Sequence, residues 1–253
     1  MLKIKELASF CLAKPEKLIN EDAFFVPFIH KNGSIVFAVA DGVGSYEGAN
    51  NASKIAIECL SNELENNDLQ NDEYSIKNVF DAIKLKISEL ADNHSQLSKA
   101  ATTLSIVAVT NNKIEIAHIG DSRIYYKDAN NKLKQLTQDH TKYQELLDSR
   151  EFSLKRLREH KARLSRVLTQ AITKDHNLKY DFYTINLNDI PKHNDCIFLY
   201  AMTDGAYNFW EKRPKFSDKT MSSPVSYVSS LKKRIEKIGA EDDYTLIALS
   251  ISV

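Results

Sequence analysis

Four short apolar segments of this sequence each run into an aspartate or start from one. The segments are rich in Val, Ile and Phe, a composition typical of buried β-strands. The acids at their ends are Asp41, Asp121, Asp204 and the pair Asp242–Asp243. Carboxylates at the edge of an apolar sheet repel one another and resist desolvation, so they stay ionised only beside cations or basic groups. The fold must therefore supply such partners where these strands end.

The apolar pattern predicts the elements that carry these acids. The expected strands span residues 7–13, 35–40, 103–109, 114–119, 196–202 and 244–251. Two of the runs are nearly continuous, so both faces of those strands should be covered. Apolar residues at helical spacing predict helices at 49–64, 76–90 and 229–238, with Gly239 as the cap of the last. Because the helices come in pairs between groups of strands, the pattern favours an α+β layered sandwich with largely antiparallel sheets.

Glycine marks the same strand ends. There are seven glycines in 253 residues, yet Gly42, Gly120 and Gly205 each adjoin one of these aspartates. A glycine there lets the backbone turn sharply and brings its carbonyl close to whatever the carboxylate holds. No cluster of Lys or Arg lies in these turns, so oxygen ligands indicate hard cations such as Mg²⁺ or Mn²⁺, which can activate water and bind phosphoryl oxygens. The alternative, that Asp-Gly pairs only form turns, fits any single pair better than the whole set.

The overall composition excludes some partners. With 34 basic and 34 acidic residues the formal net charge is zero, which removes the main argument for nucleic acid or an anionic membrane as an obligatory partner. No apolar run approaches the roughly 20 residues of a bilayer-spanning helix. Residues 7–13 follow two lysines, but no small-x-small cleavage pattern comes after them, so we interpret them as a strand. Three well-separated cysteines suit a reducing compartment, and we expect a cytoplasmic protein with one domain across residues 1–253.

Eight short motifs follow one another along the chain. They are Asn20–Ala23, Ala40–Gly44, Ala101–Leu104, Gly120–Arg123, Leu136–Thr141, Val167–Ala171, Thr203–Gly205 and Asp242–Thr245. Each motif is weak alone, but the ordered set resembles the metal-dependent serine/threonine protein phosphatases of the PP2C type over nearly the whole chain. The resemblance implies a four-layer αββα sandwich, with two sheets packed face to face and helices outside, in agreement with the α+β sandwich expected above.

The resemblance also implies ligands for two Mg²⁺ or Mn²⁺ ions. Asp41 would bridge the two ions, with the carbonyl of Gly42 on one of them. Asp204 and Asp242 would complete the carboxylates that touch the metals. Asp121, together with Asp204, would hold a weaker third ion.

Three further residues acquire catalytic roles by the same resemblance. Glu21 and Asp22 would act on metal-bound waters. Lys17 stands five residues before Asp22, where the family usually has an arginine, and would add positive charge for the substrate phosphate. Arginine grips a phosphate with a two-pronged fork, whereas lysine is a point charge on a flexible stem. We therefore expect weaker or less oriented phosphate binding.

Three other positions depart from the family pattern. Val43 stands where some members have a histidine proposed to protonate the leaving group, so protonation is expected from a metal-bound water. Ser45 replaces the second glycine of that turn. Asp243 replaces the asparagine usually found beside Asp242, and its added charge could tighten metal binding or unbalance the site.

Two histidines near these motifs are expected to be structural. His118 is in phase with Ile114 and Ile116, which predicts a packed, hydrogen-bonded side chain. His140 follows Asp139 at the start of an expected helix, where capping and local hydrogen bonds are favoured over metal ligation.

A basic segment, residues 153–166, has leucines at near-helical spacing and predicts a solvated amphipathic helix. The resemblance places it in a flap-like insertion of about residues 142–166 beside the metal site. Basic side chains there could attract acidic or multiply phosphorylated protein segments.

Together these features predict a phosphatase that hydrolyses phosphoserine and phosphothreonine by attack of a water bridging two Mg²⁺ or Mn²⁺ ions. Its expected partners are phosphorylated proteins, with a Ser/Thr kinase acting in opposition, and we expect a monomer. Two alternatives stay open. A catalytically weak pseudophosphatase or phosphoprotein-binding module is favoured by Lys17, Ser45 and Asp243, and a hydrolase of small phosphate esters would use the same scaffold.

Overall fold

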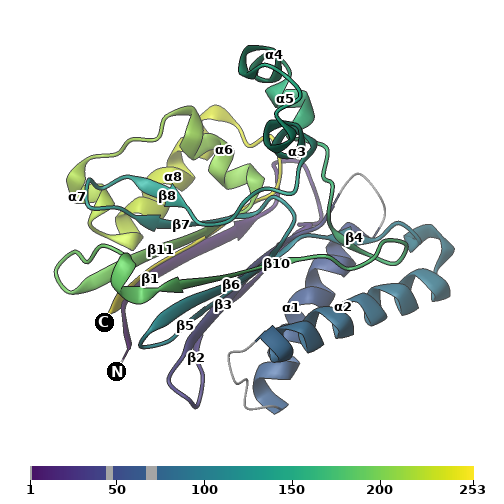
Figure 1. The fold of residues 1–253 in the computed structure, drawn as a ribbon, viewed down its shortest axis with the longest axis horizontal. Helices are drawn as coiled ribbons and strands as arrows, with labels where there is room; N and C mark the ends of the chain where they lie inside the picture. Colours follow the sequence, from purple (N-terminus) through teal and green to yellow (C-terminus); the bar gives the residue numbers. More distant parts are fainter. Residues whose placement is uncertain (1, 44–47, 67–72) are drawn as a thin grey trace.

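Two antiparallel sheets of five strands each lie face to face (Figure 1). The computed structural model describes residues 2–43, 48–66 and 73–253, so Ser45 and its predicted role lie outside the described residues. The first sheet has the order β1 (Lys3–Leu12), β12 (Tyr244–Ser252), β11 (Cys196–Met202), β7 (Arg123–Lys127), β8 (Leu133–Gln135). The second sheet has the order β10 (Asp181–Asn186), β6 (Lys113–Ile119), β5 (Leu104–Val109), β3 (Ile35–Asp41), β2 (Asp22–Ile29). A small third sheet pairs β4 (Ala101–Thr102) with β9 (Ile172–Thr173).

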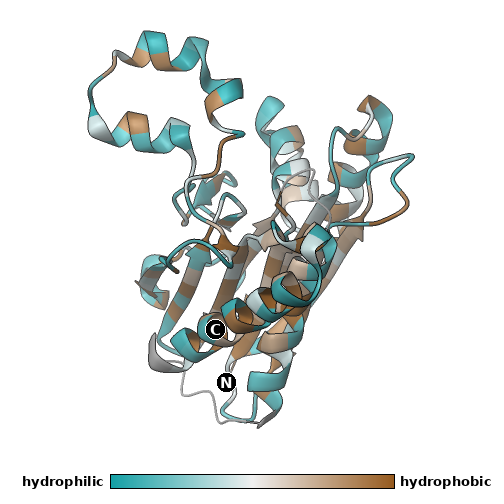
Figure 2. Cartoon of the chain, turned by 90° about the vertical axis from the view of Figure 1, so that its right-hand side faces the viewer, coloured by the Kyte–Doolittle hydropathy of each residue, from teal (hydrophilic) through white to brown (hydrophobic). Residues whose placement is uncertain are grey.

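Helices cover the outer face of each sheet. The second sheet packs against α1 (Ala49–Asn66) and α2 (Glu73–Asn93), and the first against α6 (Asp204–Lys212), α7 (Asp218–Met221) and α8 (Pro224–Ile238). Two single-turn helices, η1 (Ser95–Leu97) and η2 (Leu187–Asp189), connect other elements. No helix within the described residues combines the length and apolarity that crossing a bilayer requires. Figure 2 shows the apolar residues concentrated on the strands between these helices.

Strand β3 shows how the sequence produces the layers. All six residues from Ile35 to Ala40 are buried. Alternate side chains point to opposite faces of a strand. One set packs between the two sheets, namely Ile35, Phe37 and Val39. The other set packs beneath α1 and α2, namely Val36, Ala38 and Ala40. The predicted α+β sandwich with two antiparallel sheets is confirmed, including its covered apolar strands.

The expected elements are present, with some bounds corrected. The first strand begins earlier than residue 7, at Lys3. Helix α8 begins before residue 229, because Ser223 caps it by accepting a hydrogen bond from the Ser226 N–H at 3.2 Å and Pro224 occupies the first turn. Gly239 ends it as predicted, with a φ of 98° and its N–H donating to the Ile235 carbonyl.

The prediction of one amphipathic helix over residues 153–166 is wrong. The segment forms two short helices, α4 (Leu154–Glu159) and α5 (Lys161–Leu164), separated at His160. Leu157 is the only buried side chain of the pair, so little packing stabilises a longer helix. Helix α3 (Lys142–Ser149) precedes them, and all three lie beyond the ends of the sheets in Figure 1. We call residues 142–166 the flap.

Lys127, at the end of β7, is 1% exposed. Its ammonium donates to the Met221 carbonyl at 3.0 Å and lies 3.5 Å from the centroid of the Phe198 ring. Burial lowers the pKa of Lys127 to about 8. In the unfolded chain the pKa is higher, so folding below pH 8 must bury a charge that the solvent would otherwise stabilise. This cost disappears as the pH rises from the folded pKa toward the unfolded one.

We therefore expect Lys127→Met to raise the free energy of unfolding at about pH 7 by about 2 kcal/mol, after subtraction of the lost hydrogen bond. The gain should shrink toward about pH 10, where the wild-type lysine is neutral in the folded protein. Urea unfolding at both pH values measures the effect, with the exposed Lys134→Met as the control. A loss of stability at neutral pH, unchanged at high pH, would contradict the buried charge.

Candidate metal centre

The ends of four long strands bring the predicted acids to one side of the sandwich. Asp22 begins β2 and pairs directly with Asp41, the last residue of β3. In the facing sheet, Asp204 follows the end of β11, and Asp242 precedes the start of β12. Because β11 and β12 are antiparallel neighbours, those two acids lie at the same end of the first sheet.

Asp22 connects the two sheets. Its Oδ2 atom accepts hydrogen bonds from the hydroxyls of Thr203 at 2.8 Å and Thr245 at 2.7 Å, both from the facing sheet's strand ends. Its Oδ1 atom is buried and has no hydrogen-bond partner. Burial, followed by the charges of Asp204 and Asp243, raises the pKa of Asp22 to about 8. A buried oxygen without a partner is an unusual feature that a cation would satisfy.

Asp41 lies within the electrostatic field of the other acids. Burial raises its pKa well above the ordinary value, and the carboxylates of Asp22, Asp204, Asp121 and Asp242 raise it further. The backbone of Asp41 is fixed by Thr103, whose N–H donates to the Asp41 carbonyl and whose hydroxyl accepts from the Asp41 N–H. The five predicted carboxylates therefore share one region, although they come from distant parts of the chain.

Asp204 has partial compensation for its burial. Burial and the charge of Asp242 raise the pKa of Asp204 to about 6. The N–H of Gly205 and the positive charges of Arg123 and Arg166 oppose this rise. Arg166 is the last residue of the flap, so the flap contributes positive potential to this region.

Two glycines allow the backbone to approach closely at the site. A Cβ atom on Gly42 would lie 2.5 Å from the Ala49 carbonyl oxygen and 2.7 Å from that of Glu21. A Cβ atom on Gly205 would lie 1.9 Å from the carbonyl oxygen of Asp243. Because these glycines have no Cβ atom, the neighbouring backbone segments can approach closely. The scarce Asp-Gly pairs therefore have a packing role beyond making a turn.

The residues present fit a divalent cation chemically. The donors are carboxylates, and one buried carboxylate oxygen, Oδ1 of Asp22, has no partner. Burial, and then mutual repulsion, raise the pKa values of Asp41 and Asp204, and a cation would offset both effects. Within residues 2–43, 48–66 and 73–253, no three His, Cys, Asp or Glu side chains converge closely enough to hold an ion at one point. The oxygens are thus gathered in one region but are not in coordination geometry.

Arg123 anchors the turn that carries Asp121. It donates from Nε to Asp139 Oδ1 at 2.8 Å and from Nη2 to Asp139 Oδ2 at 2.5 Å, and it pairs with Glu211. Burial, then Asp204 and Asp139, raise the pKa of Asp121 well above its ordinary value, and Arg123 opposes them. The position of Arg123 in the Gly120–Arg123 motif did not indicate this structural role, although bidentate pairing of Arg with Asp is frequent.

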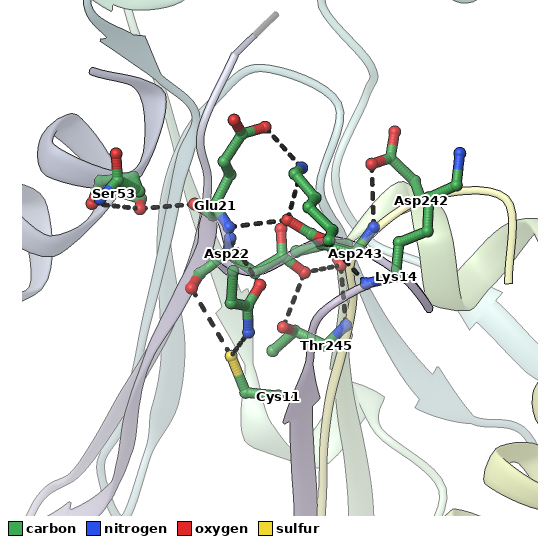
Figure 3. A network of polar contacts seen from close by, with 12 residues as sticks. Cys11, Lys14, Glu21, Asp22, Ser53, Asp242, Asp243 and Thr245 are labelled. Carbon is green, nitrogen blue, oxygen red and sulfur yellow. Dashed lines mark hydrogen bonds and ion pairs between the residues drawn. The ribbon is translucent and has the colours of Figure 1, made fainter. Parts of the chain in front are cut away.

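A second polar network joins residues 14–21 to the start of β12 (Figure 3). The Asp243 carboxylate, 3% exposed, accepts from Lys17 Nζ at 2.8 Å and from the Glu21 N–H at 2.7 Å. Lys17 Nζ also lies 2.7 Å from Glu21 Oε2. The structure therefore places two predicted catalytic residues, Lys17 and Glu21, in contact with Asp243, and the third, Asp22, directly follows Glu21 in the chain.

The two histidines are hydrogen-bonded, as expected. His118 is fully buried between Ser105 Oγ at 2.8 Å and the Gln138 carbonyl at 3.0 Å, and burial lowers its pKa to about 4. His140 accepts from the Gly120 N–H at Nδ1, and its Nε2 lies 3.1 Å from Asp181. The helix cap next to it is made by Thr141 instead, whose Oγ1 accepts from the Gln144 N–H.

The strand-end hydroxyls are the site residues that the sequence analysis missed. Thr203 and Thr245 hold Asp22, and the Thr203 Oγ1 also accepts from the Thr245 N–H at 3.0 Å. Thr203 directly precedes Asp204, and Thr245 lies two residues after Asp243, so a hydroxyl within two residues of a strand-end aspartate was the available signal.

Comparisons with known proteins agree with this arrangement. A family model described as protein phosphatase 2C matches residues 14–238. The protein phosphatase PhpP of Streptococcus pneumoniae is 27% identical over 177 residues, which cover 68% of this chain and 70% of that protein. The serine/threonine phosphatase Stp1 from Staphylococcus aureus has a similar structure, with a TM-score of 0.79, 19% identity and coverage of 98% of this chain and 95% of that chain. The catalytic domain of the serine/threonine protein phosphatase PstP in complex with two manganese ions gives a TM-score of 0.76, 18% identity and full coverage, 100%, of both chains.

Proposed function

This chain belongs to the protein phosphatase 2C family, and we propose that it is a metal-dependent phosphatase that hydrolyses phosphoserine and phosphothreonine in proteins. The observation that carries this proposal is the burial of Asp41 among four further carboxylates from both sheets; burial, and then their charges, raise its pKa well above the ordinary value. Acids at such a density are unfavourable for folding unless cations neutralise them, so their presence supports a metal-dependent activity over a purely structural role.

We assign the metal-holding role to Asp41, Asp204 and Asp242, with the carbonyl of Gly42, and a weaker third position to Asp121 with Asp204. Oxygen donors of this kind prefer Mg²⁺ or Mn²⁺. When bound, such ions would lower the pKa of a coordinated water and neutralise the phosphoryl oxygens of the substrate.

The chain itself orients and neutralises the groups around that position. Thr203 and Thr245 fix one oxygen of Asp22 and leave the other free to accept from a water. Glu21 lies beside Asp22 at the edge of the site and is half-buried, so its carboxylate reaches solvent. The ammonium of Lys17 contacts two carboxylates, those of Glu21 and Asp243.

The flap adds positive charge to that of Arg123 at the site. Arg166 acts on both Asp204 and Glu241. Five other basic residues lie within residues 153–166, namely Lys155, Arg156, Arg158, Lys161 and Arg163. We propose that this segment attracts acidic or multiply phosphorylated stretches of the substrate protein.

The wider setting follows from the same reasoning. We propose that residues 1–253 act as one domain, with the flap as its insertion, and that the protein works as a monomer in the cytoplasm. Its partners would be phosphoproteins modified by a Ser/Thr kinase, without nucleic acid or membrane as a partner. The neutral net charge supports the last point.

Hydrolysis of a phosphothreonine peptide tests the proposal. We expect turnover with Mn²⁺, loss of turnover with a chelator, and a loss of at least about 100-fold in Asp204→Asn, since a charge that holds a metal is removed. The exposed Asp189→Asn is the matched control and should keep full activity. Faster hydrolysis of an aryl phosphate or a nucleotide than of the peptide would favour a small-ester hydrolase. Activity that survives both the chelator and Asp204→Asn would contradict the metal-dependent mechanism.

A further inference from the structure

Lys17 and Asp243, two positions at which this chain departs from the family pattern, are in direct contact. Lys17 Nζ lies 2.8 Å from Asp243 Oδ2, although 226 residues separate them. The Lys17 side chain is 28% exposed and that of Asp243 only 3% exposed. The same ammonium lies 2.7 Å from Glu21 Oε2. The two departures are thus parts of one structural unit.

Both oxygens of Asp243 are used as acceptors. Oδ1 accepts from the Lys14 N–H at 2.8 Å, while Oδ2 accepts from the Glu21 N–H at 2.7 Å and from Lys17. An asparagine at this position would offer one acceptor oxygen and would turn an NH₂ group toward another donor. This arrangement of three donors therefore requires an aspartate at position 243.

These bonds join the starts of two strands in different sheets. Residues 14–21 lead directly into β2, and Asp243 leads into β12. The Asp243 N–H donates to Asp242 Oδ1 at 2.8 Å, so the neighbouring acid is held by the same residue (Figure 3). The position of Glu21 is consequently tied to that of Asp242.

The charge of Asp243 needs a counter-charge at this depth. A carboxylate that is almost fully buried and near other acids is costly unless it is paired. Partial burial opposes protonation of Lys17, but its hydrogen bonds to Asp243 and Glu21 raise the pKa of the ammonium well above its ordinary value. Two carboxylates that contact one ammonium neutralise its positive charge, so it attracts a substrate phosphate only weakly.

We propose that Lys17 and Asp243 form a positioning pair, which holds Glu21 and Asp242 in place, and that Lys17 is not the group that binds the substrate phosphate. Each member depends on the other: the lysine neutralises the buried aspartate, and the aspartate keeps the lysine away from the phosphate position. The statement about the phosphate rests on the proposed function, whereas the mutual dependence of the pair does not.

A double-mutant cycle tests the pair. Lys17→Met, Asp243→Asn and the double variant are compared with the wild type by thermal melting in chelator. Lys17→Met alone leaves a buried charge unpaired and should lower Tm by about 6 °C or more. In the Asp243→Asn background the same substitution should lower Tm by less than about 2 °C, because the charge is then absent.

Kinetics on a phosphothreonine peptide with Mn²⁺ separate positioning from phosphate binding. Misplacing Glu21 and Asp242 should lower kcat of Lys17→Met by about tenfold or more, with KM changed by less than about threefold. The Lys113–Glu115 pair, whose carboxylate is 6% exposed, provides the control. Its cycle with Lys113→Met and Glu115→Gln should change Tm without changing kcat.

Two outcomes would overturn the inference. Additive changes in Tm would show that Lys17 and Asp243 are independent. A tenfold or larger rise in KM for Lys17→Met, with Tm and kcat unchanged, would identify Lys17 as a phosphate ligand. If the wild type hydrolyses no phosphopeptide, the proposed function fails, while the melting cycle still decides whether the pair exists.

Discussion

Asp41→Asn is expected to abolish phosphopeptide hydrolysis, by at least about 1000-fold, while leaving the metal-free protein at least as stable as the wild type. Burial raises the pKa of Asp41, and the charges of four other acids raise it further, namely those of Asp22, Asp204, Asp121 and Asp242. An asparagine removes both the cost of burying this carboxyl group and its repulsion by the other acids, so Tm in chelator should rise by about 3 °C. The bonds to Thr103 involve only the Asp41 backbone and survive the substitution.

The opposite signs of these two effects make the test specific. Activity assays and thermal melting with and without Mn²⁺ measure them together. Asp189→Asn changes an exposed acid that follows β10 at the opposite end of the second sheet, and it should change neither quantity. A variant that loses activity and also melts well below the wild type in chelator would indicate that Asp41 serves the fold rather than the site.

Gly205→Ala is the second substitution with a large expected effect. Its Cβ would lie 1.9 Å from the Asp243 carbonyl oxygen and 2.9 Å from the carbonyl carbon, so backbone must move. The movement separates α6, which starts at Asp204, from the start of β12. We expect a loss of about 3 kcal/mol in the free energy of unfolding and a loss of activity of at least about 100-fold.

Chemical denaturation and peptide hydrolysis measure these losses. Gly33→Ala is the matched control, since nothing lies within 4 Å of its added Cβ. Its positive φ, 84°, should cost about 1 kcal/mol and leave activity intact. If Gly205→Ala proved no more harmful than Gly33→Ala, the close approach of α6 and β12 would not be a requirement of the site.

The layers of the fold could be predicted from local patterns because a strand that is buried on both faces is apolar at nearly every position. Ile35 to Ala40 is apolar at every position, and the structure covers both of its faces. The flap shows the limit of such patterns. Its leucines are spaced as in a helix, but Leu157 is the only buried side chain of α4 and α5. With so little packing, residues 153–166 form two short helices instead of one.

The sequence could predict which residue types belong to the candidate site, but not which of them contact one another. Strand-end acids beside glycines identified Asp41 and Asp204, but the pairing of Asp22 with Asp41 depends on the register of β2 against β3. The contact between Lys17 and Asp243 spans 226 residues and follows from how the sheets stack. Position along the chain does not determine such contacts. For this reason the sequence presents Lys17 and Asp243 only as two separate departures from the family pattern.

Calorimetric titration of the metal-free protein with Mn²⁺ tests the central claim most directly, namely that the carboxylates of two sheets form one cation-dependent site. If the carboxylates form such a site, we expect saturable binding of two ions to the wild type, and of one ion or none to Asp41→Asn. Binding that does not saturate, or that is the same in the wild type and Asp41→Asn, would contradict it.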